Sequence, residues 1–309
     1  ALGAWLREAE REMEPHRTAG TYRGFDGTEL PWQAVHADRP RAHVVLLHGF
    51  TEFPEKYREL CRYLRQAGCT VWLPVLRGHG QGGIVHVDRF EDYVRDIACF
   101  LRDIVPERPL LFGHSMGGGV AARLLQERPD CAARAVLCSP MLCPQTGRAP
   151  HWLAFGCARM LLRRGERKKS PLFSGAYDPD AEFSCSGCTS RARFRAAMDC
   201  RAERPAYQTM GASNRWVYES LALRSRVLSP RACRRVQVPV LVCSAGRDTQ
   251  VGLREQRLLA ARLPQGRLLE FPDEKHELYN AGNAGLAAFL GAVLEFFGLT
   301  AGYGKEETK

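Results

Sequence analysis

The chain has 309 residues, 45% of them hydrophobic, which suffices for one large α/β core with an insertion. No run of about 18 apolar residues occurs, so we expect no membrane-spanning helix. The first residues of the given sequence lack the basic-then-apolar form of a secretory signal. The net charge is +10, but no nucleic-acid-binding motif accompanies it, and we expect no nucleic-acid partner.

Strand-like and helix-like segments alternate in the first part of the chain, after an N-terminal surface helix and a hairpin that turns at Asp26-Gly27. Continuous apolar runs predict the strands, and apolar residues at helical spacing predict the helices. The expected strands cover 20–25, 29–36, 44–47, 70–75, 110–112 and 135–138, and the expected helices cover 1–15, 55–67, 90–104 and a segment ending at 127. This alternation predicts a mostly parallel central sheet with helices on both faces.

The most informative stretch is Gly-His-Ser-Met-Gly at residues 113–117, which follows an apolar strand and precedes a helix rich in small residues. A strand, a sharp turn and a helix form a nucleophile elbow, in which the serine occupies a strained backbone position. Gly113 and Gly117 have no side chains, so neighbouring backbones can approach closely. Ser115 is therefore the candidate nucleophile.

An acid and a histidine follow in the order that such an elbow requires. Asp248 lies in a loop after the apolar run 236–243, and His276 lies in a loop after the run 268–271. A serine hydroxyl is a poor nucleophile at neutral pH, so His276 is expected to take its proton and Asp248 to orient the imidazole. No metal or other cofactor is needed for this chemistry, and we expect none.

The oxyanion hole is expected from two backbone N–H groups, which leave no side-chain signature. One is that of Met116, after the nucleophile, and the other is that of Phe50, in the turn after the strand 44–47. His48 is expected to brace this turn. We also predict that Gly49 and His114 contact the substrate.

The alternation stops at Ser139-Pro140, and residues 141–227 contain helix formers and arginine but no apolar strand run. The sheet resumes at residue 236, and a helix at 286–294 precedes a polar tail from residue 298. This pattern predicts an α-helical cap inserted into an α/β core. The expected boundaries are 1–140 for the first part of the core, 141–227 for the cap and 228–309 for the second part of the core.

The positive charge is concentrated near this insertion. Residues 141–235 contain 18 basic and 7 acidic residues, a balance of +11, so the remainder of the chain carries −1. A dense run contains Arg163, Arg164, Arg167, Lys168 and Lys169. We predict that the first three contact an anionic head group and that the basic cap touches an anionic membrane surface, at the inner membrane of the cell. A solvated face is the simpler alternative.

The 12 cysteines do not indicate a disulfide scaffold in a chain of this length, and they favour a reducing, cytoplasmic compartment. Several lie in apolar runs, where they act as small hydrophobic residues. Cys185 and Cys188 have the spacing of metal ligands, but no second pair accompanies them. We interpret them as an incidental pair in a loop.

The chain resembles the α/β-hydrolase superfamily throughout, and within it the family of bacterial L2-type lysophospholipases and monoacylglycerol lipases. The resemblance is carried by His-Gly-Phe-Thr-Glu at 48–52, Arg-Gly-His-Gly at 77–80, the elbow, and His-Val-Asp-Arg-Phe-Glu-Asp-Tyr-Val at 86–94, which is the most specific of these stretches. It implies an α/β-hydrolase fold and a serine ester hydrolase. It also implies a substrate with one acyl chain on a glycerol backbone.

Three functions stay open from the sequence. A lysophospholipase fits the resemblance and the basic cap. A monoacylglycerol lipase or broad carboxylesterase would use the same chemistry and be indifferent to phosphate. A ligand-binding protein on a hydrolase scaffold would retain the fold without turnover, and the three intact candidate residues count against it.

Overall fold

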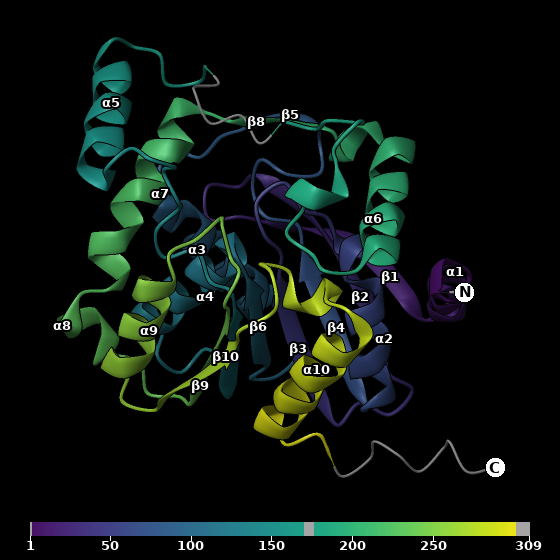
Figure 1. Ribbon diagram of the computed structural model, residues 1–309. Helices are drawn as coiled ribbons and strands as arrows, with labels where there is room; N and C mark the ends of the chain where they lie inside the picture. The colour runs from purple at the N-terminus through teal and green to yellow at the C-terminus, as the bar shows by residue number, and fades with distance from the viewer. Residues whose placement is uncertain (1, 170–175, 301–309) are drawn as a thin grey trace.

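The computed structural model describes residues 2–169 and 176–300 (Figure 1). The strands are β1 Arg17–Arg23, β2 Glu29–Val35, β3 Ala42–Leu47, β4 Cys69–Pro74, β5 Gly83–Val85, β6 Leu110–His114, β7 Arg134–Cys138, β8 Thr209–Ala212, β9 Val240–Ala245 and β10 Gly266–Phe271. The helices are α1 Leu2–Met13, α2 Arg58–Gln66, α3 Phe90–Asp103, α4 Met116–Glu127, α5 His151–Arg163, α6 Arg191–Glu203, α7 Asn214–Val227, α8 Pro230–Cys233, α9 Leu253–Arg262 and α10 Asn283–Phe297. Most of the predicted polar tail, residues 301–309, lies outside the described residues.

Eight of the strands form one sheet in the order β1-β2-β4-β3-β6-β7-β9-β10. The hairpin β1-β2 and the pair β2-β4 are antiparallel, and the other neighbours are parallel. The predicted mostly parallel α/β sheet is therefore confirmed. The carboxyl ends of parallel strands meet at one edge, where a site can be assembled from several loops.

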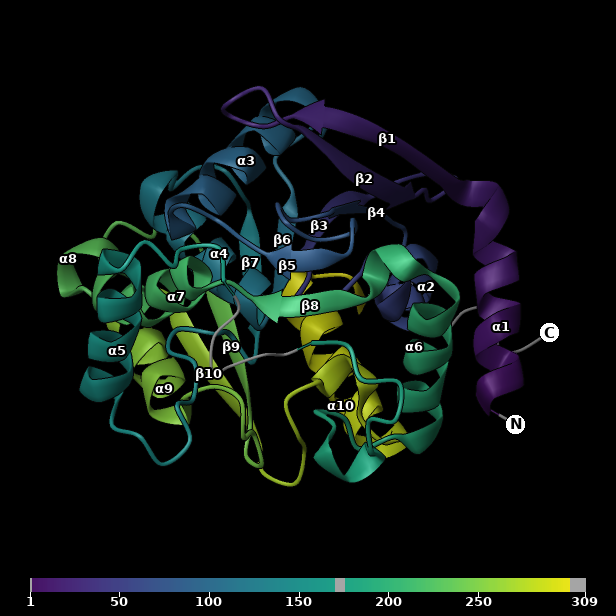
Figure 2. The same cartoon turned by 90° about the horizontal axis from the view of Figure 1, so that it is seen from above.

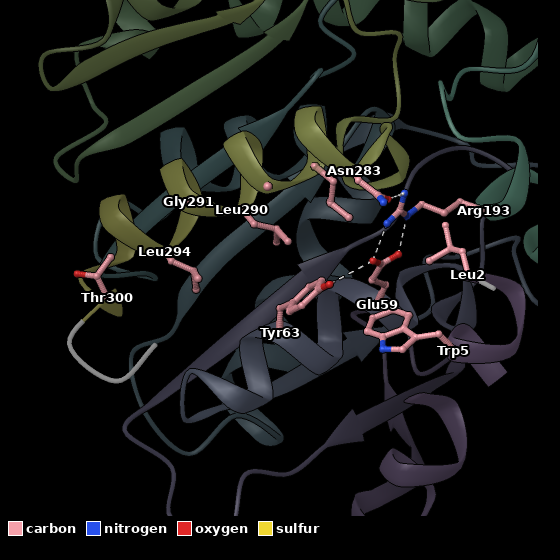
Figure 3. Close-up of a pocket in the computed structure, with 12 residues that line it drawn as sticks. Leu2, Trp5, Glu59, Tyr63, Arg193, Asn283, Leu290, Gly291, Leu294 and Thr300 are labelled. Carbon is pink, nitrogen blue, oxygen red and sulfur yellow. Dashed lines mark hydrogen bonds and ion pairs between the residues drawn. The ribbon is translucent and has the colours of Figure 1, made fainter. Parts of the chain in front are cut away.

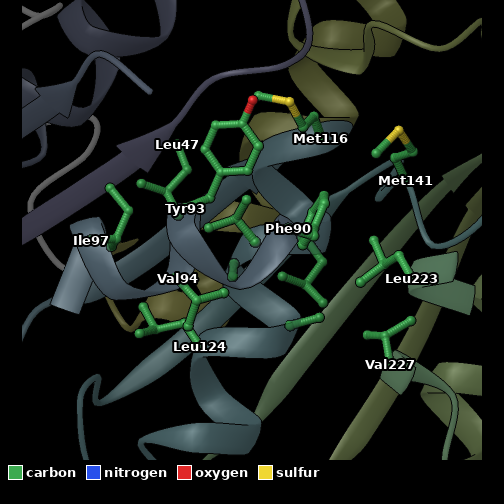
Figure 4. Packing of buried hydrophobic residues seen from close by; sticks show 14 of the residues in the cluster. Leu47, Phe90, Tyr93, Val94, Ile97, Met116, Leu124, Met141, Leu223 and Val227 are labelled. Atoms are coloured by element: carbon green, nitrogen blue, oxygen red, sulfur yellow. The ribbon is translucent and has the colours of Figure 1, made fainter. Parts of the chain in front are cut away.

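Two hydrophobic clusters cover the two faces of this sheet. Successive side chains of a strand point to opposite faces, so Val45 and Leu47 of β3 belong to one cluster and Val44 and Leu46 to the other. Helices α3, α4, α7 and α9 contribute to the first cluster, and α2 and α10 to the second. Figure 4 shows part of the first cluster, with labelled side chains from α3, α4 and α7 packed together.

The segment between β7 and β9 crosses the top of the sheet as drawn in Figure 1, with α5 at one end and α6 at the other. Seen from above in Figure 2, β8 runs between these helices beside β5. The two strands form a separate parallel pair, which the sequence did not predict. Leu223 and Val227 of α7 are fully buried in the first cluster, so the last part of the expected cap packs with the core helices.

The predicted N-terminal helix exists, but it is more than a surface helix. Leu6, Ala9 and Met13 are buried, because α1 packs against both α2 and α6. Glu10 accepts a hydrogen bond from Arg58 of α2 at 2.7 Å. Among the described residues, no helix is long and apolar enough to cross a membrane.

Candidate active site

Ser115 lies at the turn between β6 and α4, with φ 50° and ψ −117°. A non-glycine residue at positive φ is strained, and here the neighbours enforce it. A Cβ on Gly117 would lie 2.1 Å from the Leu47 carbonyl oxygen, and one on Gly113 would lie 2.6 Å from the Gly117 carbonyl oxygen. The expected elbow is therefore confirmed, with Ser115 at the positive end of α4.

His276 and Asp248 are joined by a hydrogen bond of 2.6 Å between Nδ1 and Oδ2, and both residues are buried. The other oxygen of Asp248 accepts the N–H groups of Gln250 at 2.8 Å and Val251 at 3.2 Å. Both carboxylate oxygens are thus engaged, which fixes the carboxylate. A proton on Nδ1 leaves Nε2 as the acceptor that a general base needs.

Of the two residues predicted to supply the oxyanion donors, Met116 directly follows Ser115 in the chain, and Phe50 lines a cavity that Ser115 also lines. Met116 is the first residue of α4, so its N–H has no acceptor within the helix. Within residues 2–169 and 176–300, the N–H of Phe50 also donates no hydrogen bond. His48 braces the Phe50 turn, as predicted, because its Nδ1 lies 2.8 Å from the Gly49 oxygen and its Nε2 accepts from the Leu76 N–H at 3.0 Å.

Ser115 and His276 line a cavity of about 370 Å³. Its lining includes Phe50 and the two residues predicted to contact substrate, Gly49 and His114. The structure therefore brings the candidate nucleophile, base, oxyanion loop and these two residues together around one space. Their catalytic and binding roles stay predictions.

The predicted cationic contacts are not at this cavity. Arg163, Arg164 and Arg167 are exposed at the end of α5 and in the loop after it, and the cavity lining does not include them. The cations of the lining are Lys56 and Arg201. Contact between the basic run and a lipid surface stays a prediction, and it concerns the outside of the cap.

A buried charge cluster underlies the cavity and was not foreseen, although one of its members, Glu52, lies in the His-Gly-Phe-Thr-Glu motif at 48–52. Lys56 Nζ lies 2.6 Å from Glu52 Oε1 and 2.8 Å from Glu277 Oε1. Glu52 also accepts from the Gly49 N–H at 2.7 Å and from the hydroxyls of Tyr57 and Tyr279, the latter at 2.7 Å. The same carboxylate therefore organises the oxyanion loop and holds Lys56.

The pKa values of this cluster follow from its geometry. Burial alone would raise the pKa of the Glu52 carboxyl, but Lys56 and the hydrogen-bond donors hold it well below its ordinary value. Burial would likewise raise the pKa of Glu277, which Lys56 lowers. The pKa of Lys56 is raised, because the two carboxylates outweigh its burial. All three groups are thus held in their charged forms.

His114 separates this cluster from the candidate base. Its ring centre lies 4.8 Å from that of His276, and its Nε2 lies 3.7 Å from Glu52. Burial lowers the pKa of His114 to about 4. The imidazole is therefore neutral near pH 7 and adds no positive charge beside His276.

One wall of the cavity is bonded to the loop that carries His276. The wall segment, residues 184–189, begins within the short 3₁₀ helix Phe183–Cys185. The N–H of Glu277 donates to the Gly187 oxygen at 2.7 Å, and Lys275 Nζ donates to the oxygens of Ser184 at 3.0 Å and Ser186 at 3.1 Å. The cap and the candidate base are therefore fixed to one another.

A second hollow, of about 590 Å³, lies between α1, α2 and α10 (Figure 3). Its walls are mostly apolar, and the ion pair of Glu59 with Arg193 lies at one end. Neither Ser115 nor His276 lines it. The candidate chemistry therefore belongs to the smaller cavity.

The cysteine pair that had metal-ligand spacing lies in the cap. Cys185 is exposed and lines the cavity, while Cys188 is buried. In the part of the chain that the structure describes, no group of three or more histidine, cysteine or acidic side chains could hold a metal ion. Within the described residues, the pair therefore has no third ligand.

Comparison with known proteins finds hydrolases of lipid esters among the relatives. The chain is 29% identical over 291 residues to lysophospholipase L2 of Escherichia coli K12, covering 86% of this chain and 82% of that protein. It is 35% identical to human monoglyceride lipase over 109 residues, which cover 33% of this chain and 36% of the lipase.

Solved structures show the same fold. Monoacylglycerol lipase of Paleococcus ferrophilus matches with a TM-score of 0.70 and 24% identity over 89% of this chain and all of that chain. A soluble variant of monoglyceride lipase from Saccharomyces cerevisiae, in complex with a substrate analogue, matches with a TM-score of 0.70 and 15% identity over 93% of this chain and 96% of that one.

A family model described as serine aminopeptidase, S33, matches residues 38–282. This range contains the elbow, the acid, the histidine and the whole cap. The chain therefore belongs to this family of α/β hydrolases and is a serine hydrolase related to lipases and lysophospholipases.

Proposed function

We propose that the protein hydrolyses carboxylic esters of single-acyl-chain lipids and that lysophospholipids are its substrates. The proposal rests on one arrangement. His276 is hydrogen-bonded to Asp248, and it lines the same cavity as Ser115, which occupies the strained turn of the elbow. This arrangement has the parts that acyl transfer to serine requires.

The reaction proceeds in two steps. Ser115 Oγ attacks the ester carbonyl as its proton passes to His276 Nε2, and the N–H groups of Phe50 and Met116 stabilise the negative oxygen. The proton then goes to the leaving alcohol as the ester bond breaks, which leaves an acyl-serine. Water, deprotonated by His276, attacks the acyl group and releases the fatty acid and free Ser115.

The choice of ester over peptide rests on the charges at the cavity. An aminopeptidase needs an available carboxylate for the ammonium group of its substrate. Glu52 and Glu277 line the cavity, but Lys56 holds both of them. The similarity to lysophospholipase L2 over 86% of the chain supports a lysophospholipid, and the shorter similarity to monoglyceride lipase supports a monoacylglycerol as the second candidate.

Peripheral contact with an anionic membrane is part of the proposal, and its site is α5. Trp152, Leu153 and Met160 of this helix are exposed, Trp152 to 72%. The basic run at its end is exposed as well. Exposed apolar side chains beside basic ones suit a helix that lies in a membrane interface. Because the cysteine content favours a reducing compartment, we propose that this contact is made at the inner face of the membrane.

The proposal is tested with a substrate panel and Ser115→Ala. We expect kcat/KM to be higher for lysophospholipids than for monoacylglycerols of the same chain length and for p-nitrophenyl esters. Ser115→Ala should lower kcat by about 10⁴-fold or more, because the nucleophile, base and acid act as a unit. A fluorophosphonate should label the native protein and not this variant.

Ser225→Ala is the matched control, since Ser225 is exposed on α7 and its hydroxyl donates to the Ala222 oxygen of the same helix. It should keep native turnover and labelling. Near-native turnover in Ser115→Ala would refute the mechanism. A native protein that binds lysophospholipid but neither turns over nor labels would be a ligand-binding protein, and higher kcat/KM on monoacylglycerols would identify a monoacylglycerol lipase.

A further inference from the structure

Arg201 lies in the last turn of α6 and lines the same cavity as Ser115 and His276. The cavity lining contains one other cation, Lys56, and two carboxylates already hold that ammonium group. Arg201 is therefore the cation of the cavity that can act on a substrate.

The hydrogen bonding of Arg201 is incomplete. One Nη2 donor reaches the carbonyl oxygen of Thr51, in the oxyanion loop. Its Nε is buried and, across residues 2–169 and 176–300, has no acceptor. Within those residues no carboxylate lies within 4.0 Å of its guanidinium. A guanidinium has five N–H donors, so within the described part of the chain most of the N–H donors of Arg201 have no acceptor.

Two neighbouring arginines that also reach the core differ from Arg201. Arg193 pairs with Glu59 at 2.6 Å, and Arg204 pairs with Glu55. Each of these cations is thus neutralised by an acid of the core. Burial lowers the pKa of Arg201, and the carboxylates of Glu52 and Glu277, which make no ion pair with it, offset this only in part, so a bound anion would relieve the remaining cost of its desolvation.

Two aromatic rings hold the guanidinium in place. Its carbon lies 5.5 Å from the ring centre of Phe53 and 5.9 Å from that of Tyr177. Contacts of this kind bind the face of a guanidinium and leave its N–H edge free. The edge of a planar guanidinium matches two oxygens of a phosphate, and such charge-assisted pairs are strong and selective.

We propose that Arg201 binds the phosphate group of the substrate and so selects lysophospholipids over neutral monoacylglycerols. The inference rests on the proposed ester hydrolysis and assigns its head-group selectivity to one side chain. It replaces the exposed residues Arg163, Arg164 and Arg167 in that role.

The experiment compares Arg201→Gln and Arg201→Lys with native protein, using a palmitoyl lysophospholipid and palmitoyl glycerol in neutral detergent micelles. In Arg201→Gln the ratio of kcat/KM for the lysophospholipid to that for palmitoyl glycerol should fall by about tenfold to a hundredfold, the usual worth of a hydrogen bond to a charged group. Arg201→Lys should keep part of the ratio, because it keeps the charge without the bidentate edge. Arg195→Gln, which removes a charge from the exposed face of α6, should leave the ratio unchanged.

Direct binding separates this inference from the hydrolase proposal. Calorimetry with glycerol 3-phosphate should show binding to native protein and at least tenfold weaker binding to Arg201→Gln. If the lipid head group is the natural ligand, inorganic phosphate should bind to native protein more weakly than glycerol 3-phosphate does. An equal fall in kcat/KM on both lipids, or unchanged glycerol phosphate binding, would overturn the inference and leave Arg201 as a brace for Thr51. Absence of turnover and of fluorophosphonate labelling would overturn the hydrolase proposal, while the binding comparison would still decide the role of Arg201.

Discussion

The two ends of the inserted segment contain similar side chains and use them differently. In the α6 arm, residues 183–207, three of the arginines turn toward the core, while Arg191 and Arg195 are exposed. Arg193 pairs with Glu59, Arg204 with Glu55, and Arg201 reaches Thr51 at the cavity. In the α5 arm, residues 151–169, the basic residues at the end of the helix are exposed, and the ion pair of Lys169 with Glu166 is a surface contact of 3.3 Å.

This contrast shows that the net charge of residues 141–235 is the sum of two groups of cations with unrelated functions. One set of cations fastens the cap and lines the cavity, and the other set faces solvent. Buried cations with partners determine structure and site geometry, whereas exposed cations act at a distance and are screened by salt. The three predictions below test this division.

The largest effect is expected in the α6 arm. Arg193 donates to Glu59 at 2.6 and 2.8 Å, and both side chains are about 4–5% exposed. Arg193→Met should therefore lower the free energy of unfolding by about 3–5 kcal/mol, because it leaves a buried carboxylate without its partner. Urea denaturation measures this loss. Arg195→Met, on the exposed side of the same helix, should stay within about 0.5 kcal/mol of native protein, and an equal loss in both variants would contradict the division.

A slightly smaller effect, with a distinct pH dependence, is expected beneath that arm at Lys56. Glu52 and Glu277 have lowered pKa values in the fold, so their ionisation stabilises the native protein above the unfolded pKa near about 4.3, and this contribution is lost as the pH falls through the lower folded values. Lys56→Met should cost about 3 kcal/mol at neutral pH.

The same variant should respond to acid in the opposite sense. Two buried carboxylates without a cation have raised pKa values, so protonation removes their repulsion and stabilises the variant. Native protein loses stability over the same pH range. Denaturation curves from about pH 7 to pH 3.5 should therefore converge. Lys168→Met, in the α5 arm, should follow the native curve at every pH, and a constant gap for Lys56→Met would show that Lys56 acts only by packing.

The smallest effect on the folded protein is expected in the α5 arm. Neutralising Arg163, Arg164, Arg167, Lys168 and Lys169 together should change stability by less than about 1 kcal/mol, yet weaken binding to anionic vesicles by tenfold or more, since each basic residue near such a surface contributes about 1 kcal/mol. Vesicle sedimentation measures the binding, and high salt should reproduce the loss in native protein. Unchanged vesicle binding would identify the run as a solvated face.

The sequence predicted the elements whose structure depends on local pattern. Apolar runs located β3, β4, β6 and β9, and the elbow followed from glycines at 113 and 117 that leave room for close backbone contacts. The order of serine, acid and histidine predicted which loops meet. The β5–β8 pair was missed, because it joins residues 83–85 to 209–212 and depends on how the cap folds back on the core.

The sequence also could not predict which cap side chains point toward the cavity and which point toward solvent. Arg163 and Arg201 occur in similar arginine-rich helices, and nothing local distinguishes the exposed one from the one that lines the cavity. The cluster of Lys56 with Glu52 and Glu277 also depends on tertiary contact, since Glu277 is over 200 residues from its partners. The short spacing of Glu52 and Lys56 was the available signal, and it is typical of any helix start.

The wall formed by residues 184–189 limits how this cavity can be reshaped. Moving that backbone outward would break the hydrogen bonds from Glu277 to Gly187 and from Lys275 to Ser184 and Ser186. Since Lys275 and Glu277 flank His276 in the chain, this movement would also shift His276. On this side of the cavity, the width cannot be changed without also changing the position of His276. Room for a longer or branched acyl chain has to come from shortening Phe194 or Met198 on α6, whose side chains reach the cavity from a backbone that Arg193 holds fixed.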